Sequence, residues 1–98
     1  MRVRWTQRAT QDLRDIGDYI AQDSPEAARR WVARLKTRAR DAAPFPFAGR
    51  RVPEEDRDDV REVFLGAYRI VYQVYPEFID ILTVFEGHRL FPKEVSED

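Results

Sequence analysis

The residues best suited to chemistry lie in the last third of the chain, in and just after the stretch GAYRIVYQVYPEFIDILTVFEGHR (66–89). Arg69 sits among Tyr, Ile and Val residues, and His88, the only histidine, precedes Arg89. Arginine stays charged and binds phosphate or carboxylate groups, whereas histidine exchanges a proton near neutral pH. The combination predicts either a surface that binds an anionic group or solvated charges at the edge of a sheet.

Each of these side chains also has a structural interpretation. Arg69 would then pair with a carboxylate such as Asp80 or Glu62 on one face of a sheet. His88 and Arg89 would be exposed polar residues beyond a strand end. The sequence leaves both interpretations open.

Several kinds of site are absent from the sequence. The chain has no cysteine and one histidine, so a zinc site of thiolate and imidazole ligands is not expected. It has no glycine-rich phosphate loop and no nucleophile elbow. We therefore expect neither a metal nor a cofactor.

The composition predicts a single small domain over residues 1–98. Charged residues make up 36% of the chain, but the net charge is −1, which points to no polyanionic partner. No apolar run approaches the roughly 20 residues that span a bilayer, and MRVRW has no apolar signal-peptide core. We expect a soluble, cytoplasmic protein without a membrane partner and without sequence-specific DNA binding of its own.

Hydrophobic periodicity predicts a strand over residues 1–5 and a helical hairpin over residues 6–43. Thr6 is a typical helix N-cap, and Ser24 followed by Pro25 is typical of a second helix start. The apolar stripes of the two helices recur at spacings of three and four: Ala9, Leu13, Ile16 and Ile20, then Ala28, Val32, Leu35 and Ala39.

Residues 44–59 contain three prolines and a glycine, which predicts a loop that Phe45 and Phe47 pin to the core. Residues 60–89 predict three antiparallel strands, 60–65, 68–75 and 78–85, and residues 90–98 a tail that frays unless Phe91 docks. The expected fold is α+β, in the order β-α-α-β-β-β, with the hairpin packed on one face of a small antiparallel sheet. The face that carries Arg69, Val71, Gln73 and Tyr75 is expected to be at least partly open.

The second predicted helix is strongly basic. Residues 24–43 hold six basic and two acidic side chains, whereas residues 44–62 and 63–98 have an excess of acids. This pattern indicates either an ordinary solvated helix face or a surface that meets an acidic partner.

The order of these motifs resembles the RelE/ParE superfamily of bacterial toxins from type II toxin–antitoxin systems. The resemblance covers nearly the whole chain, and YRIVYQV (68–74) is its most specific part. GRRVPE (49–54) and VRE (60–62) look more like the ParE branch. The resemblance implies a helical hairpin against an antiparallel sheet, and a small antitoxin that binds and neutralises the toxin.

The two branches act differently. RelE-type members resemble ribosome-dependent endoribonucleases, whereas ParE-type members are associated with poisoning of DNA gyrase and have no catalysis of their own. Arg69 and Arg89 match two arginines of the nucleases. The positions of the nucleases' two lysines and tyrosine fall on Val60, Glu62 and Val95, none of which is lysine or tyrosine. The nuclease hypothesis then depends on His88 and Glu62 as acid and base groups.

We therefore expect a ParE-like toxin, a growth inhibitor that binds and poisons DNA gyrase and forms a hetero-oligomer with a ParD-like antitoxin. An enzyme is the less favoured interpretation: a ribosome-dependent mRNA endoribonuclease with Arg69, Arg89 and His88 at its site. A third is a protein with the toxin fold but without toxicity, kept for antitoxin binding and autoregulation. Candidate target-binding residues are Arg61, Arg69, His88 and Arg89, and candidate antitoxin-binding residues are Trp31, Arg34, Arg38 and Tyr72.

Overall fold

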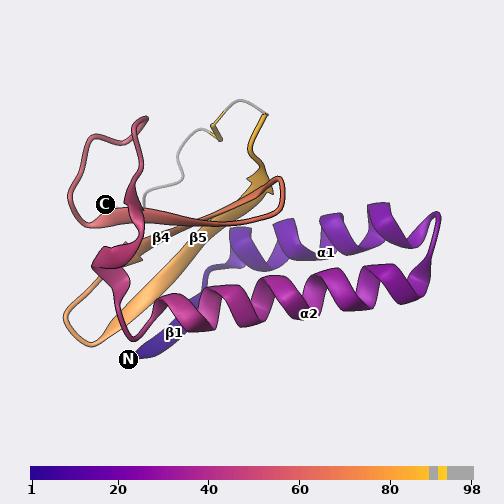
Figure 1. Cartoon of the computed structure of the whole chain (residues 1–98), viewed down its shortest axis with the longest axis horizontal. Coiled ribbons are helices and arrows are strands. Elements are labelled where there is room, and N and C mark those ends of the chain that lie inside the picture. The colour runs from indigo at the N-terminus through magenta and orange to yellow at the C-terminus, as the bar shows by residue number, and fades with distance from the viewer. Residues whose placement is uncertain (89–90, 93–98) are drawn as a thin grey trace.

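The computed structural model describes residues 1–88 and 91–92 (Figure 1). Its elements follow the predicted order, with one short 3₁₀ helix and one two-residue strand added inside the predicted loop. They are β1 (Arg2–Trp5), α1 (Gln7–Ala21), α2 (Pro25–Ala42), η1 (Pro46–Ala48), β2 (Arg50–Arg51), β3 (Val60–Leu65), β4 (Tyr68–Val74) and β5 (Phe78–Glu86).

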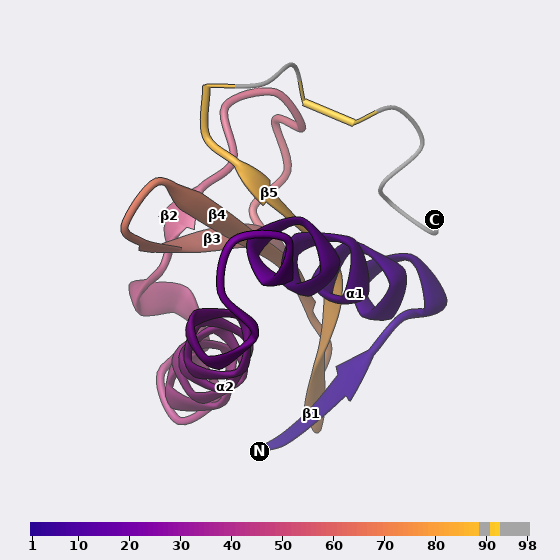
Figure 2. The same ribbon diagram turned by 90° about the vertical axis from the view of Figure 1, so that its right-hand side faces the viewer.

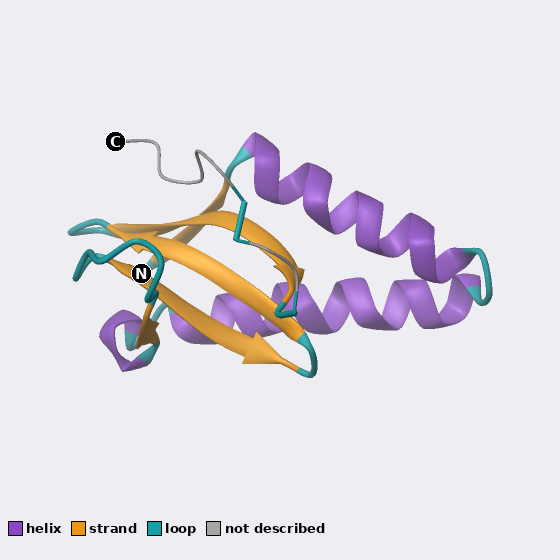
Figure 3. Cartoon of the chain, turned by 90° about the horizontal axis from the view of Figure 1, so that it is seen from above, coloured by secondary structure: helices purple, strands orange, loops and turns teal. Residues whose placement is uncertain are grey.

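The two helices begin at the predicted caps. The Thr6 hydroxyl accepts a hydrogen bond from the backbone N–H of Ala9, and the Ser24 hydroxyl accepts one from Ala27. Pro25 occupies the first turn of α2, where its missing N–H costs nothing. Figure 3 shows that the loop joining the helices lies well beyond the end of the sheet, so the tip of the hairpin projects from the molecule.

The five strands form one sheet in the order β1-β5-β4-β3-β2. β3, β4 and β5 pair with one another in antiparallel fashion, as predicted, and the additional strand β2 pairs antiparallel with β3. β1 pairs with β5 in parallel, so the sheet is mixed rather than wholly antiparallel. The alternation of side chains predicts which residues share a face of a strand, but it does not predict which strand lies beside it. The parallel pairing of β1 with β5 was therefore not predicted from the sequence.

The helices cover one face of the sheet, α1 mainly over β5 and α2 over β3 (Figure 2). Two side chains at the start of the hairpin fasten α1 to β5. Thr6 donates to the carbonyl of Ile81 at 2.7 Å. Asp12 accepts a hydrogen bond from the Thr83 hydroxyl at 2.5 Å and from the Val84 N–H at 3.2 Å. The main core fills the layer between: Ala9, Leu13, Leu35, Ala39, Ala42, Ala43, Val63, Ile70, Tyr72, Ile79, Ile81 and Val84.

The opposite face of the sheet is also covered, which corrects the expectation of an open face. Arg69, Val71 and Gln73 on β4 are all buried. A second cluster on this face contains Val52, Val60, Val71, Leu82 and Phe85, with Phe91 packed against it. The loop between β2 and β3 and the Phe91 ring therefore cover this face. Phe91 docks against the sheet, which is the contact on which the order of the tail was expected to depend.

Phe45 and Phe47 do not pin the loop, contrary to the prediction, because both rings are more than half exposed. The loop is held instead by Tyr72, whose hydroxyl donates to the Pro46 carbonyl at 2.5 Å. Gly49 lies against the same hydroxyl so closely that a β-carbon would collide with it. The anchor is thus a tyrosine of β4 that reaches the loop from the core.

Candidate functional site

Arg69 on β4 lies buried between two carboxylates and two aromatic rings. Its Nε donates to Glu62 Oε1 at 2.6 Å, and its two terminal nitrogens donate to the two carboxylate oxygens of Glu54 at 2.9 and 3.0 Å. The guanidinium carbon lies 5.1 Å from the ring centre of Phe85 and 5.5 Å from that of Phe91. The hydrogen bonds from Arg69 lower the pKa of the Glu54 carboxyl, and those to Glu54 raise the pKa of Arg69. We call these five residues the Arg69 clamp.

Glu62 in this clamp is fully occupied by two arginines. Arg50 on β2 donates to Glu62 Oε2 from Nε at 2.8 Å and approaches it with a terminal nitrogen at 2.6 Å, while Arg69 binds Oε1. The Glu62 side chain has no exposed surface. Val60, the other position that the resemblance compares with a nuclease lysine, is buried in the second cluster. Neither position presents a group that could exchange a proton with a bound molecule.

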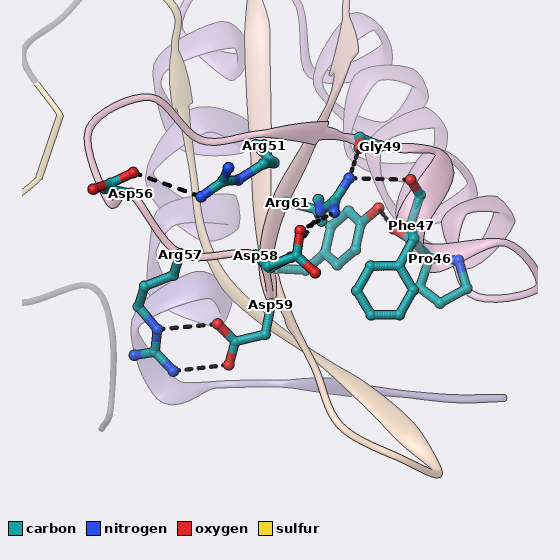
Figure 4. Close-up of polar contacts among 10 residues, drawn as sticks. Pro46, Phe47, Gly49, Arg51, Asp56, Arg57, Asp58, Asp59 and Arg61 are labelled. Carbon is teal, nitrogen blue, oxygen red and sulfur yellow. Dashed lines mark hydrogen bonds and ion pairs between the residues drawn. The ribbon is translucent and has the colours of Figure 1, made fainter.

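Arg61 on β3 holds the loop from the other side of the sheet, because neighbouring residues of a strand face opposite ways. Its guanidinium donates to the backbone carbonyls of Phe47, Gly49 and Asp58 and to the Asp58 carboxylate (Figure 4). It also stacks on the Phe47 ring at 5.1 Å. Arg61 and Arg69 therefore lie on opposite faces and do not form one cationic site.

Two further ion pairs, Arg57 with Asp59 and Arg51 with Asp56, lie within the loop and β2 (Figure 4). Arg57 donates twice to the Asp59 carboxylate, at 3.0 and 2.8 Å, and Gln73 donates to it at 3.2 Å. Burial tends to raise the pKa of Asp59, but these hydrogen bonds outweigh it and leave that pKa below its ordinary value. Arg51 lies 3.6 Å from Asp56, whose φ of 48° is in the left-handed region that aspartate tolerates.

His88 lies just after β5 and is accessible. Its side chain is 71% exposed, and Nε2 lies 3.4 Å from Oε2 of Glu86. The preceding Gly87 lies against the side chain of Arg69, so His88 is close in the fold to the Arg69 clamp. Arg89 and Val95, named with it in the sequence prediction, lie outside the described residues.

Three of the four candidate antitoxin-binding residues form one surface. The Trp31 ring meets the Tyr68 ring edge-on at 5.7 Å, and the Arg34 guanidinium lies 4.8 Å from the centre of the Trp31 ring. Arg38 Nε donates to the Phe64 carbonyl at the outer edge of β3, at 3.1 Å. Tyr72 is the exception. Its side chain is wholly buried, so it cannot touch a partner in this structure, which corrects that prediction.

Within residues 1–88 and 91–92, no group of histidine, cysteine and acidic side chains is arranged to hold a metal ion. Over the same residues, no helix is both long and apolar enough to cross a membrane. The described site therefore consists mainly of arginines, and most of them bind carboxylates or backbone carbonyls of the same chain.

Comparison with known proteins decides the family. The family model of the ParE toxin of the type II toxin–antitoxin system parDE matches residues 3–91. The chain belongs to the ParE toxin family. Among relatives of this ParE-family toxin, the Y4kP protein of Sinorhizobium fredii (strain NBRC 101917 / NGR234) is 39% identical over 94 residues, which cover 94% of each chain.

A second relative and a solved structure agree with the family. The protein named Toxin RelE2 of Caulobacter vibrioides (strain ATCC 19089 / CIP 103742 / CB 15) is 40% identical over 88 residues, covering 90% of this ParE-family toxin and 97% of the relative. A chain of the structure titled "Chromosomal ParDE TA system from P. aeruginosa" superposes with a TM-score of 0.73 at 25% identity. The match covers 88% of this chain and 95% of that one, and it supports the α+β fold described above.

Sequence reasoning missed the partners that enclose Arg69. Glu62 had been named as one possible partner, but Glu54 and Arg50 had not. Glu54 lies 15 residues away in sequence, in a loop with no periodic pattern to predict its path. The available signal was Glu62 itself, an acid on the same face of the strand as Val60 and Phe64, because a buried carboxylate needs a partner that neutralises it.

Proposed function

We propose that this ParE-family toxin inhibits growth by binding and poisoning DNA gyrase in the cytoplasm, and that a cognate antitoxin neutralises it in a hetero-oligomer. The family match and the likeness to a chain of a ParDE system support the antitoxin. The choice of gyrase over RNA is supported by the enclosed state of Arg69 and Glu62.

The enclosed state of Arg69 and Glu62 argues against a nuclease, because a nuclease needs such groups free to contact RNA. Cleavage of RNA through its 2′-hydroxyl needs a base, an acid and cations that face the phosphate. Here the Arg69 guanidinium already binds two carboxylates, and Glu62 already binds two arginines. Freeing either group would leave a buried charge without its partner, at a cost of several kcal/mol. A toxin built this way is better suited to act by binding than by catalysis.

The test is a supercoiling assay with purified gyrase, relaxed plasmid and increasing amounts of the folded toxin. We expect loss of supercoiling or accumulation of linear, cleaved DNA. The matched control is the same amount of toxin preincubated with its antitoxin, which should restore supercoiling. Full gyrase activity at a large excess of folded toxin would contradict the proposal.

A ribosome-dependent ribonuclease is the second candidate, favoured by two observations. His88 is accessible and lies beside Glu86, and one relative is named Toxin RelE2. If His88 is an acid or base group, His88→Ala should reduce mRNA cleavage in a translating extract about 10²–10⁴-fold. The same substitution should leave the effect on gyrase nearly unchanged.

Expression without the antitoxin separates both candidates from a fold that is not toxic. We expect growth to stop when the wild-type chain is induced alone and to continue when the antitoxin is induced with it. Normal growth in the presence of abundant, folded toxin would contradict the gyrase and the ribonuclease proposals together.

A further inference from the structure

The segment that follows α2 presents two phenylalanine rings to solvent. It reads Pro44-Phe45-Pro46-Phe47, and its last two residues begin η1. Phe45 is 76% exposed and Phe47 is 53% exposed. Phenylalanine is among the residues that are most often buried, and apolar side chains gathered at one exposed place mark interaction sites. We call residues 44–47 the phenylalanine turn.

The backbone of the phenylalanine turn is held in place from within the fold. The buried Tyr72 donates from its hydroxyl to the Pro46 carbonyl. Arg61 donates to the Phe47 and Gly49 carbonyls, both at 3.1 Å, and its guanidinium carbon lies 5.1 Å from the Phe47 ring centre (Figure 4). The two prolines restrict the backbone further. A turn that is ordered before binding loses little entropy on binding, so its exposed rings are suited to anchor a partner.

The phenylalanine turn lies far from the hairpin tip and in a basic part of the chain. Figure 1 shows the end of α2, which leads into η1, at the end of the molecule opposite the loop that joins the helices. Residues 36–51 hold five basic side chains and one acidic side chain, in a chain whose net charge is −1. Arg40, in the last turn of α2, is exposed. A partner that surrounds the two rings should therefore be acidic at that place.

These features fit a protein partner better than a nucleic acid. Arg50, Arg51 and Arg61 each bind or approach a carboxylate of the same chain, which leaves few cations near the turn to follow a phosphate backbone. Two projecting rings instead need a concave apolar pocket, and such pockets form preferentially between domains. A large protein offers pockets of this kind, whereas a short peptide segment does not.

We propose that the phenylalanine turn docks into an apolar pocket with an acidic rim on DNA gyrase, with Phe45 and Phe47 as its anchors. The inference rests on the proposed function, because it takes gyrase as the occupant. It assigns target binding to apolar side chains rather than to the arginines that the sequence suggested. Arg61 then acts through Phe47, by holding the ring and the backbone that present it.

Removal of the rings tests the anchors. In the supercoiling assay with purified gyrase, full-length toxin with Phe45→Ala/Phe47→Ala should need at least about ten times more protein for half-maximal inhibition. Phe45→Ala alone leaves the contact of Phe47 with Arg61 in place and should raise that concentration at least about threefold. The matched control is Tyr19→Ala, which removes a ring of a residue that is 69% exposed on α1 and should change the concentration less than about twofold.

Charge reversal tests the acidic rim. Arg40→Glu should raise the half-maximal concentration at least about threefold at about 50 mM salt and less at about 300 mM salt, because salt screens exposed charges. Arg30→Glu is the control. It makes the same change at an exposed site about 15 Å away along α2, and it should raise the concentration less than about twofold. Circular dichroism and thermal unfolding verify the fold of every variant.

The outcomes separate the inference from the function on which it rests. Wild-type toxin that leaves gyrase fully active would overturn the proposed function itself. Wild-type toxin that inhibits gyrase, with both alanine variants equally inhibitory, would overturn only the role of the phenylalanine turn. An equal loss of inhibition in Tyr19→Ala would also overturn that role, because exposed rings in general would then be needed.

Two binding measurements test the other possible occupants of the turn. The probes are a fluorescently labelled single-stranded oligothymidine and the antitoxin encoded beside this toxin. We expect no binding of the oligonucleotide at micromolar toxin, and equal antitoxin affinity for the wild type and for Phe45→Ala/Phe47→Ala. Oligonucleotide binding that the double variant loses would make the turn a nucleic-acid site. Lost antitoxin affinity with full inhibition of gyrase would make it an antitoxin site, and either result would overturn the inference.

Discussion

At the scale of single residues, the clearest result concerns Arg69. The sequence made this side chain a candidate for binding a target, and the structure shows that it holds parts of the fold together. Arg69 bridges the strand pair to the loop through Glu62 and Glu54, and two rings cover its guanidinium. A buried ion pair contributes little net stability compared with apolar side chains, but removing one partner is costly because the other stays charged and buried. The loop over the second sheet face is therefore tied to Arg69.

We predict that Arg69→Met lowers the free energy of unfolding by about 3 kcal/mol, because Glu62 keeps only Arg50 as a partner. Urea unfolding followed by tryptophan fluorescence measures the change. The control is Arg51→Met, whose partner Asp56 is almost fully exposed, and it should change stability by less than about 1 kcal/mol. A stable Arg69→Met protein that no longer acts on gyrase would instead make Arg69 a target-binding residue.

Two carboxylates, Glu54 in the clamp and Asp59 outside it, predict how stability depends on pH. Glu54 and Asp59 have pKa values below their ordinary 4.5 and 3.8 in the folded state. The unfolded chain thus binds protons first as the pH falls, so their contribution is complete above about pH 5 and is lost below it. Unfolding measured from pH 7 to 2 should show this drop, and Glu54→Gln should make it shallower. Glu55→Gln, a neighbouring carboxylate outside the clamp, should leave the slope unchanged.

At the scale of elements, the sequence predicted the helices and strands that have a periodic hydrophobic pattern. It did not predict the features that have no such pattern. The helical stripes and caps gave the hairpin, and the alternating strands gave β3, β4 and β5 with nearly their observed bounds. The parallel place of β1 and the path of the loop after α2 depend on contacts between distant residues, which no local pattern encodes. The same limit explains why the sequence points to Phe45 and Phe47 as the loop's anchors, whereas Tyr72, Arg61 and Val52 are among the residues that hold it.

The contact between α1 and β5 gives a prediction at this scale. Asp12→Ala leaves the buried Thr83 hydroxyl and the Val84 N–H without their acceptor, so the free energy of unfolding should fall by about 1–3 kcal/mol. Asp15→Ala, one turn along the same helix and exposed, is the control and should cost less than about 0.5 kcal/mol. Equal stabilities of the two variants in thermal unfolding would show that the Asp12 contact contributes nothing.

At the scale of the whole molecule, the sheet lies between two unequal covers. The helices form the thick one, and the loop over the second cluster with Phe91 forms the thin one. The thin cover has few apolar contacts and depends on ion pairs, so it should open before the rest of the fold. The candidate site was only partly predictable for this reason: the residues on β4 were identified, but the cover that encloses them was not.

We predict that Phe91→Ala loosens this thin cover. The lost ring contact with Phe85 and Arg69 should cost about 1–2 kcal/mol. Hydrogen exchange should become faster at amides of the loop such as Val52, whose N–H bonds to the Val60 carbonyl, while amides of β4 and β5 stay protected. Phe45→Ala, which removes an exposed ring, is the control and should leave the pattern unchanged.

The pairing of β1 with β5 also sets when the fold can form. β1 is made first and β5 last among the strands, and Thr6 bonds to Ile81, 75 residues later. A ribosome delivers the chain from its N-terminus, so β1 and α1 cannot join their neighbour in the sheet until β5 (Phe78–Glu86) has been made. Contacts of such long sequence separation also slow folding. The layer of sheet that carries β1 thus closes in one late step, after β5 has been made.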